Sequence, residues 1–286
     1  YQETLAEIQA WLGRYGDRAD TVMPVHSTED ILAAKVSGRT GVILGFQNAT
    51  PIENDLGRLA VFHALGVRII QLSFHERSLV ADGCYEAADG GLSNFGRDAV
   101  REMNRLGILV DLSHVGERST MEAIEHSEKP VAVTHANCKG YFDRPRNKTD
   151  AAVRLLAERG GVVGATAICS FLRTQFTSTL DDFIDAIDDM VQRIGPRHVG
   201  FGIDFTQDQP KSFWRYIGSQ QGSSYPAIFQ DPKVQWDEMK LYPDDLESPD
   251  DLPNLAAALQ RRGYSDDEIK GILGGNWLRL FEEVWT

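Results

Sequence analysis

Cysteine is scarce in this chain, and its three copies lack the spacing of a structural site. Cys84, Cys138 and Cys169 are odd in number and form no C-x-x-C pair, which argues against a disulfide framework and a cysteine-based zinc site. A reducing compartment fits this composition best, so we expect a cytoplasmic protein.

The sequence also lacks long apolar runs and has fewer positive than negative residues. No run reaches the roughly 18 apolar residues that a membrane-spanning helix requires, and no charged-then-apolar signal peptide opens the chain. The 29 Lys and Arg residues stand against 42 Asp and Glu residues, a formal net charge of −13. Electrostatic repulsion therefore disfavours nucleic acid and anionic membranes as partners and favours a small-molecule substrate.

The chain alternates short β-branched apolar runs with amphipathic stretches, which is typical of parallel strands joined by crossover helices. The predicted strands cover Thr21–Met23, Thr40–Phe46, Val67–Phe74, Ile108–Ser113, Val131–Thr134, Val162–Thr166 and Val199–Asp204. The predicted helices cover Leu5–Tyr15, Thr28–Ser37, Ile52–Leu65, Gly96–Leu106, Ser119–Ser127, Thr149–Glu158 and Leu180–Ile194.

These strands are nearly continuous apolar runs, as expected for strands buried on both faces. This favours a closed, parallel (β/α)8 TIM-type barrel, an α/β fold, over an open sheet. An eighth strand is missing from the set, and we expect it to precede Tyr1. We predict a single barrel domain over residues 1–286, with an insertion or lid at about 206–250 and a helical tail at 251–286. Ser265 is the predicted cap of a helix in this tail.

Polar residues follow the carboxyl ends of four predicted strands, which share one mouth in a parallel barrel. They are Gln47, His114, His135 and Asp204. Because neutral imidazole is a good zinc ligand, His114 and His135 can converge on one divalent ion; alternatively, each ring only makes a hydrogen bond at its strand end. Asp204 can act as a metal ligand, a general base or an anchor for a substrate ammonium group, unless a structural partner neutralises it.

A basic loop follows His135. Its sequence, NCKGYFDRPRNKTD, includes Lys139, Arg144, Arg146 and Lys148. An arginine held over the mouth would bind a substrate carboxylate in a bidentate manner. The alternative is a solvated basic loop with no ligand.

Five motifs, taken in order, resemble the membrane dipeptidase family, peptidase family M19. They are LGVRIIQLS, GLSNFGRDAVREMNRLGILVDLSHVG, KPVAVTHAN, RPRNKTD and RHVGFGIDF. The resemblance implies a (β/α)8 barrel that hydrolyses dipeptides with two zinc ions bridged by a glutamate. It implies that His114 and His135 belong to the second zinc site. By the same resemblance, Arg146 holds the substrate carboxylate and Asp204 takes part in proton transfer.

The chain departs from the family pattern around the metals. Gln47 replaces the bridging glutamate, and a neutral amide does not offset the repulsion between two cations. Phe74 replaces a family histidine, and His75 is displaced by one residue, which in a strand would aim it to the opposite side unless a bulge intervened. The family's first-strand H-x-D pair has no counterpart in this sequence. A normal two-zinc centre is therefore not expected.

We predict a hydrolase that cleaves a dipeptide or related small amide with at most one zinc ion, held by His114 and His135. The predicted catalytic residues are Asp204 and His135, and the predicted substrate-binding residues are Arg146, Gln47 and His75. One alternative is a catalytically inactive barrel that binds an amino-acid-like ligand. Another is a metal-free lyase or hydrolase that uses Asp204 and a histidine. The resemblance also suggests a homodimer.

Overall fold

The computed structural model describes residues 1–206, 209–210, 212 and 240–285. Most of the predicted insertion or lid at 206–250 lies outside the described residues. The chain divides into two compact units, each built from segments that are distant in sequence. The first comprises Tyr1–Gly83, Ala88–Val131 and Leu278–Thr286, and the second comprises Cys84–Ala87 and Ala132–Trp277. The single barrel domain stays a prediction.

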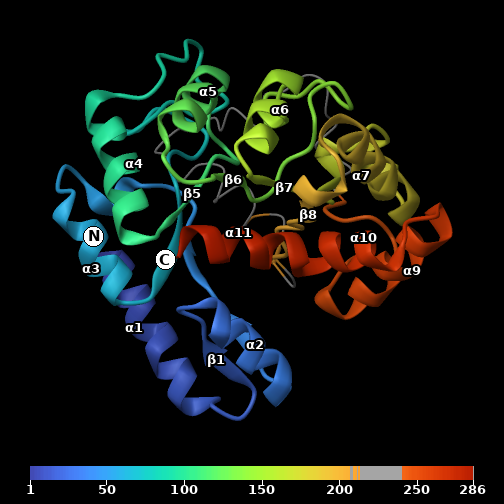
Figure 1. Ribbon diagram of the computed structural model, residues 1–286, viewed down its shortest axis with the longest axis horizontal. Helices are drawn as coiled ribbons and strands as arrows, with labels where there is room; N and C mark the ends of the chain where they lie inside the picture. Colours follow the sequence, from blue (N-terminus) through green and yellow to red (C-terminus); the bar gives the residue numbers. More distant parts are fainter. Residues whose placement is uncertain (207–208, 211, 213–239, 286) are drawn as a thin grey trace. The chain divides into compact units, whose positions relative to one another are not determined.

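In the first unit, short strands alternate with helices (Figure 1). Its elements are α1 (Gln2–Asp17), β1 (Val22–Pro24), α2 (Thr28–Ser37), β2 (Thr40–Val42), β3 (Leu44–Phe46), α3 (Gly57–Ala64), β4 (Val67–Gln71), α4 (Asn94–Leu106), β5 (Leu109–Asp111) and α5 (Glu117–His126). β1 pairs with β2, while β3, β4 and β5 pair in that order, and all of these pairings are parallel. The predicted βα alternation is confirmed in this unit.

The predicted strand Thr40–Phe46 is wrong as one element, because it divides at Ile43 into β2 and β3. β2 pairs with β1 and β3 pairs with β4, so the chain changes partner between the two strands. The pairing of β3 with β4 also shifts register between Leu44 and Gly45. Apolar continuity in the sequence does not reveal such a change of partner.

Most other boundaries also differ from the sequence prediction by one to three residues, and β8 ends at Phe201, three residues before the predicted end at Asp204. Two differences have a clear physical origin or consequence. β4 ends at Gln71, three residues before the predicted end at Phe74. The predicted helix Ile52–Leu65 is a 3-10 turn followed by α3, since Glu53 has a φ of 51°, which is incompatible with a continuous helix. The Asp55 side chain then accepts a hydrogen bond from the Gly57 amide, 2.9 Å away, at the start of α3.

Helix ends follow from local side-chain chemistry. The Ser27 side chain caps α2 and Asp30 completes a capping box, so α2 matches its predicted bounds. α4 ends at Gly107, which has φ 73° and ψ 34°, the left-handed conformation that glycine adopts without a steric penalty.

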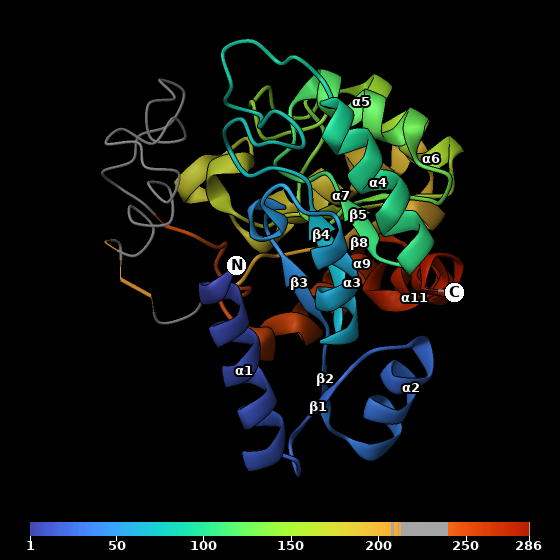
Figure 2. The same ribbon diagram turned by 90° about the vertical axis from the view of Figure 1, so that its left-hand side faces the viewer.

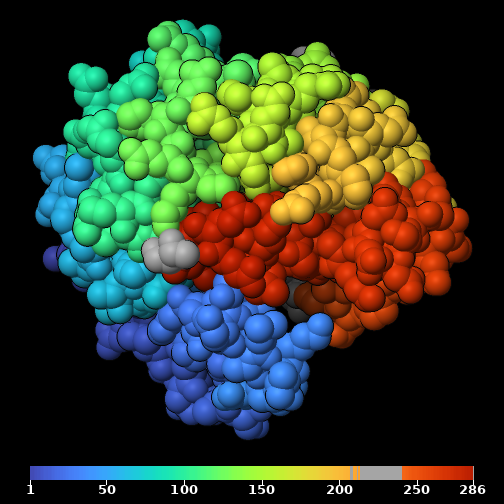
Figure 3. Space-filling model, in the orientation of Figure 1, coloured from blue at the N-terminus to red at the C-terminus, as the bar shows by residue number. Residues whose placement is uncertain are grey.

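α1 packs against β1, and α2 packs against β1 and β2 (Figure 2). The surface of residues 1–42, which contain these four elements, is coloured blue in Figure 3. Leu12 on α1 is 49% exposed, as is Leu32 on α2, and Val36 is 90% exposed. Residues 1–42 therefore add little to the buried core, which is formed mainly by later elements of the unit.

The described residues of the second unit form three parallel strands and the helices that follow them. Its elements are β6 (Ala132–Val133), α6 (Asp150–Glu158), β7 (Val162–Ala165), α7 (Leu180–Ile194), β8 (Val199–Phe201), α9 (Leu252–Arg262) and α10 (Asp266–Lys270); α11 (Asn276–Val284) begins here. β6 pairs with β7 and β7 with β8. Phe183, Ile187 and Met190 on α7 are fully buried with the strand residues Val163 and Val199. Ser265 caps α10, which confirms the predicted cap in the helical tail.

Among the described residues, no helix combines the length and the apolar character needed to cross a membrane.

Candidate functional site

His135 stands just beyond the carboxyl end of β6, where catalytic groups gather in parallel α/β folds. Its side chain is 7% exposed. The ring nitrogen Nδ1 lies 2.8 Å from Thr134 Oγ1, and either atom can be the donor, depending on the tautomer. When Nδ1–H donates to Thr134, Nε2 keeps a lone pair for a proton or a ligand. Sequence reasoning identified His135 but missed Thr134, because nothing in the apolar run VAVT marks its hydroxyl as a partner.

A glycine on β7 and a second one directly after β8 allow the backbone to pack tightly at Thr134. A Cβ atom on Gly164 would lie 2.1 Å from the Thr134 carbonyl oxygen, and one on Gly202 would lie 1.8 Å from the same oxygen. Both distances are impossible for real carbon atoms, so any larger residue would push the Thr134–His135 segment away. The position of the His135 imidazole thus depends on two glycines that carry no chemistry themselves.

The basic loop after β6 contributes Arg146, which is 1% exposed. Its Nη2 donates to the His135 carbonyl oxygen at 2.9 Å, and its Cζ lies 5.2 Å from the centre of the Phe171 ring. Arg144 and Lys148 are buried as well, at 0% and 2% exposure. The alternative of a solvated basic loop is therefore wrong for these three cations, whereas Lys139 is 41% exposed and does fit it.

Asp204 follows β8 and adopts a φ of 63°. This left-handed conformation is rare for a residue with a side chain and is often found at functional sites. The Tyr242 hydroxyl donates to the Asp204 carbonyl oxygen at 2.7 Å and accepts from the Thr206 amide at 2.8 Å. Tyr242 lies in the aromatic tract 206–250, which sequence reasoning treated only as a possible lid.

His114 and His75 belong to the first unit, where they share one aromatic cluster with Phe74. The Phe74 ring stacks on His114 with centroids 4.3 Å apart, and the His75 centroid lies 4.8 Å from that of His114. The expectation that strand alternation turns His75 away is wrong, because β4 ends at Gln71 and both Phe74 and His75 lie in the following loop. A Cβ atom on Gly83 would lie 2.2 Å from the His75 carbonyl carbon, so Gly83 lets this loop fold closely.

Gln47 follows β3, and its side chain is exposed. Its backbone carbonyl accepts a hydrogen bond from the Gln71 amide, which also donates to the Ser73 carbonyl at 2.9 Å. Gln71 is fully buried, and its Oε1 has no hydrogen-bond partner among the described residues. Sequence reasoning missed Gln71, since it lies inside a predicted strand.

The family pattern implies a metal, so we asked which side chains fit one. Among the described residues, no three His, Cys, Asp or Glu side chains form a group that could hold a metal ion. Two imidazoles supply only part of the four-ligand shell that zinc prefers. The donors described here therefore do not fit a complete zinc site, and the convergence of His114 and His135 stays a prediction.

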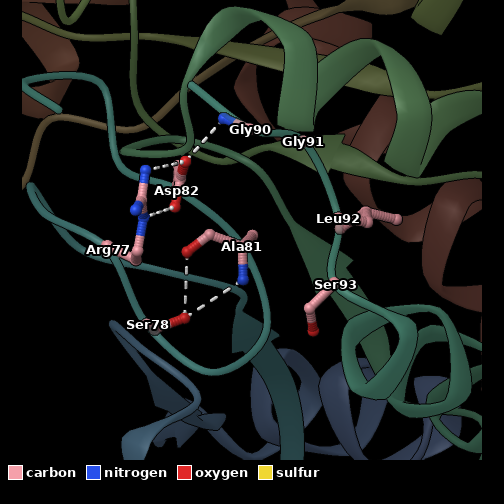
Figure 4. Close-up of a pocket in the computed structure, with 8 residues that line it drawn as sticks. All are labelled: Arg77, Ser78, Ala81, Asp82, Gly90, Gly91, Leu92 and Ser93. Atoms are coloured by element: carbon pink, nitrogen blue, oxygen red, sulfur yellow. Dashed lines mark hydrogen bonds and ion pairs between the residues drawn. The ribbon is translucent and has the colours of Figure 1, made fainter. Parts of the chain in front are cut away.

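A cavity of about 260 Å³ lies in the loop after β4 (Figure 4). Inside it, Arg77 pairs with Asp82 through two hydrogen bonds of 2.7 and 3.0 Å, and the Gly90 amide also donates to Asp82. Burial acts to raise the pKa of Asp82, but these donors outweigh it and lower the pKa. The cavity's main charges are thus already satisfied within the loop.

Comparisons with known proteins extend over the whole chain. An amidohydrolase of Pseudomonas aeruginosa is 38% identical in sequence, and its crystal structure superposes with a TM-score of 0.93, covering 100% of this chain and 85% of that one. A metallopeptidase of Rhodobacter sphaeroides, solved with a phosphinate mimic of the dipeptide L-Ala-D-Ala, is 25% identical with a TM-score of 0.79; the match covers 98% of this chain and 73% of that one. These likenesses confirm the predicted α/β class and TIM-type barrel fold.

Among curated proteins, a dipeptidase of Claviceps purpurea is 28% identical over 97% of this chain, and dipeptidase 3 of Rattus norvegicus is 27% identical over 85% of it. The chain spans only 58% and 44% of the lengths of these two relatives. The family described as membrane dipeptidase (peptidase family M19) matches residues 1–231 and 212–286. The predicted kinship is therefore confirmed, and the chain belongs to the membrane dipeptidase family, peptidase family M19.

Proposed function

We propose that this protein hydrolyses a dipeptide or a related small amide. The observation that carries the proposal is the 2.9 Å hydrogen bond from Arg146 to the His135 carbonyl. It anchors a buried guanidinium, suited to a substrate carboxylate, to the backbone of His135, whose buried imidazole lies just beyond the carboxyl end of β6. The dipeptidases among its relatives support the same reaction class.

In this proposal Arg146 binds the free carboxylate of the substrate and so fixes the scissile amide near His135. In the tautomer whose Nδ1–H donates to Thr134, Nε2 is the basic ring nitrogen and accepts a proton from the attacking water. A carbon–oxygen bond to water forms, and Asp204 accepts the remaining proton from the hydroxyl of the tetrahedral intermediate and passes it to the leaving nitrogen as the amide carbon–nitrogen bond breaks. His135 then gives its proton to the amine, so that the products are a carboxylate and an ammonium group. Gln47 and His75 are proposed as further substrate contacts.

We propose that His114 and His135 hold a single zinc ion at most. The steps above apply to the protein without zinc, because an Nε2 atom that binds a metal ion cannot also accept a proton, and the described donors do not complete a zinc shell. Elemental analysis of the purified full chain tests this proposal. More than one equivalent of zinc, or an unchanged zinc content in both His114→Ala and His135→Ala, would contradict it.

The test of function is a panel of dipeptides containing both L- and D- second residues, because the R. sphaeroides relative was solved with a mimic of L-Ala-D-Ala. We expect His135→Ala to lower kcat/KM by at least about 100-fold. His198→Ala is the matched control: its Nδ1 lies 2.9 Å from the Gly161 carbonyl oxygen, remote from these roles, and we expect unchanged kinetics. Absence of turnover by the metal-supplemented wild type would overturn the proposal in favour of an inactive barrel that binds an amino-acid-like ligand.

A cytoplasmic location and a homodimer are also proposals. Fractionation of the native host's cells tests the first, and light scattering of the purified chain tests the second.

A further inference from the structure

The loop between β6 and α6 separates its charges into an exposed pair and a buried group. Lys139 and Asp143 are 41% and 68% exposed, with Nζ and Oδ1 4.0 Å apart. Arg144, Arg146 and Lys148 are at most 2% exposed. Burial of three cations from one short loop requires compensating polar contacts, which protein groups and a bound anion can both supply.

The two buried arginines meet at one aromatic ring. The Cζ atoms of Arg146 and Arg144 lie 5.2 and 6.0 Å from the centre of the Phe171 ring. Arg144 also lies 5.8 Å from the Phe142 ring centre. Both guanidinium groups therefore lie close to the same ring, and contact with an aromatic face restricts the orientation of each.

The charges of these cations act on two neighbouring side chains of the same unit, Cys84 and Tyr85. Burial raises the pKa values of the Cys84 thiol and the Tyr85 phenol. Arg146 and Lys148 oppose this rise at Cys84, and Arg144 and Arg146 oppose it at Tyr85. A negatively charged ligand is therefore favoured in this part of the unit.

We propose that Arg144 and Arg146 act together on a ligand with two carboxylates, so that the preferred substrate ends in an acidic residue. This inference rests on the proposed dipeptidase function, in which Arg146 binds the main-chain carboxylate. Arg144 then binds the side-chain carboxylate of an Asp or Glu residue. A guanidinium has five N–H donors, so it can keep its protein contacts and still bind a carboxylate through two of them.

The kinetic test compares Ala-Asp with Ala-Ala, each with an L- or D- second residue, using the full chain supplemented with zinc. We expect the wild type to prefer Ala-Asp, and Arg144→Met to lower the ratio of kcat/KM for Ala-Asp to that for Ala-Ala by about 10- to 100-fold. Arg144→Lys keeps the positive charge but loses the planar pair of N–H donors. Its kcat/KM ratio should therefore fall between those of the wild type and Arg144→Met. Lys139→Met, from the exposed part of the same loop, should leave the ratio unchanged.

A binding test separates this inference from the hydrolase proposal. We expect aspartate to raise the melting temperature of the zinc-free wild type more than alanine does, and Arg144→Lys to reduce this difference. If aspartate binds but no dipeptide is hydrolysed, the hydrolase proposal is overturned and the preference for an acidic ligand is supported. The inference would be overturned if the wild type hydrolysed Ala-Ala with no preference for Ala-Asp and the kcat/KM ratio of the two substrates were unchanged in both Arg144 variants. The hydrolase proposal would survive that result. If Arg144→Met does not fold, the outcome for Arg144→Lys decides.

Discussion

The Tyr242 hydroxyl donates a hydrogen bond to the Asp204 carbonyl oxygen across 2.7 Å, linking two residues that are 38 positions apart in the chain. Asp204 has a φ of 63°, a conformation that costs on the order of 1 kcal/mol or more and persists only when neighbouring groups hold it. Burial raises the pKa of Tyr242, so the phenol stays protonated and able to donate at neutral pH. Tyr242 is therefore a positioning residue for Asp204.

Tyr242→Phe should lower kcat by about 10-fold with a smaller change in KM, because it loosens Asp204 without removing its carboxylate. Steady-state kinetics across pH would check this, since a displaced Asp204 also shifts the pH profile. Tyr264→Phe is the matched control: it removes a 2.7 Å hydrogen bond to Asp188, away from the site. Equal effects of the two variants on kcat would contradict a positioning role for Tyr242.

Gly202→Ala should destabilise the protein by about 2 kcal/mol or more and abolish most activity, because the new methyl group overlaps the Thr134 carbonyl. Gly13→Ala is its control, since nothing lies within 4 Å of a Cβ at this position inside α1. That substitution should instead stabilise the protein by up to about 1 kcal/mol. Urea unfolding of both variants measures the contrast, and a Gly202→Ala variant as stable as the wild type would show that Thr134 can move at little cost.

Helix positions could be predicted from sequence because their signals are local. Thr28–Ser37 and Leu180–Ile194 match to the residue, and each follows a Ser or Thr whose side chain caps the first turn. Strand ends could not be predicted as well. The partner change at Ile43 and the end of β4 at Gln71 depend on pairing with distant segments, which an apolar run does not reveal.

The candidate site was predictable to a similar extent. Polar residues at strand ends identified His135 and Asp204, and a basic loop with a family motif identified Arg146. Their partners were not predictable, because Tyr242 and Phe171 reach the site through the fold and not through sequence spacing. Burial of Arg144 was equally hidden, since a charge in a loop is usually solvated.

Asp82→Asn should destabilise the first unit at neutral pH by about 1 kcal/mol, because it weakens the hydrogen bonds that the buried Asp82 carboxylate accepts from the exposed Arg77 side chain and from the Gly90 amide. The pKa of Asp82 is lowered in the folded protein, so its contribution is present above the ordinary carboxyl pKa of 3.8 and is lost as pH falls through the lower folded value. The difference between wild type and variant should therefore shrink below about pH 4. Urea unfolding at pH 7 and pH 3 tests this, with Asp98→Asn, from an exposed pair with Arg101, as the control. A constant difference at both pH values would count against the linkage.

Alkaline pH should destabilise the second unit through its buried thiols. Burial, assisted by the Asp189 carboxylate, raises the pKa of Cys138 to about 12 from an ordinary value of 9.0, and burial raises the pKa of Cys169 to about 12. Because the pKa values of both thiols are higher in the folded protein than in the unfolded chain, their contribution to stability is fully present below about pH 9. It is lost as the pH rises towards about 12.

We expect a loss of about 1–2 kcal/mol per thiol between pH 9 and pH 11, measured by urea unfolding under reducing conditions. Cys138→Ala removes one titrating group and should flatten this dependence, although it lowers stability at pH 7 by deleting a buried side chain. Tyr141 has its pKa raised by burial to about 12 and adds to the loss only above pH 10, so Tyr141→Phe should change the slope in that higher range alone. If Cys138→Ala keeps the wild-type slope between pH 9 and pH 11, the Cys138 thiol is not the group that titrates.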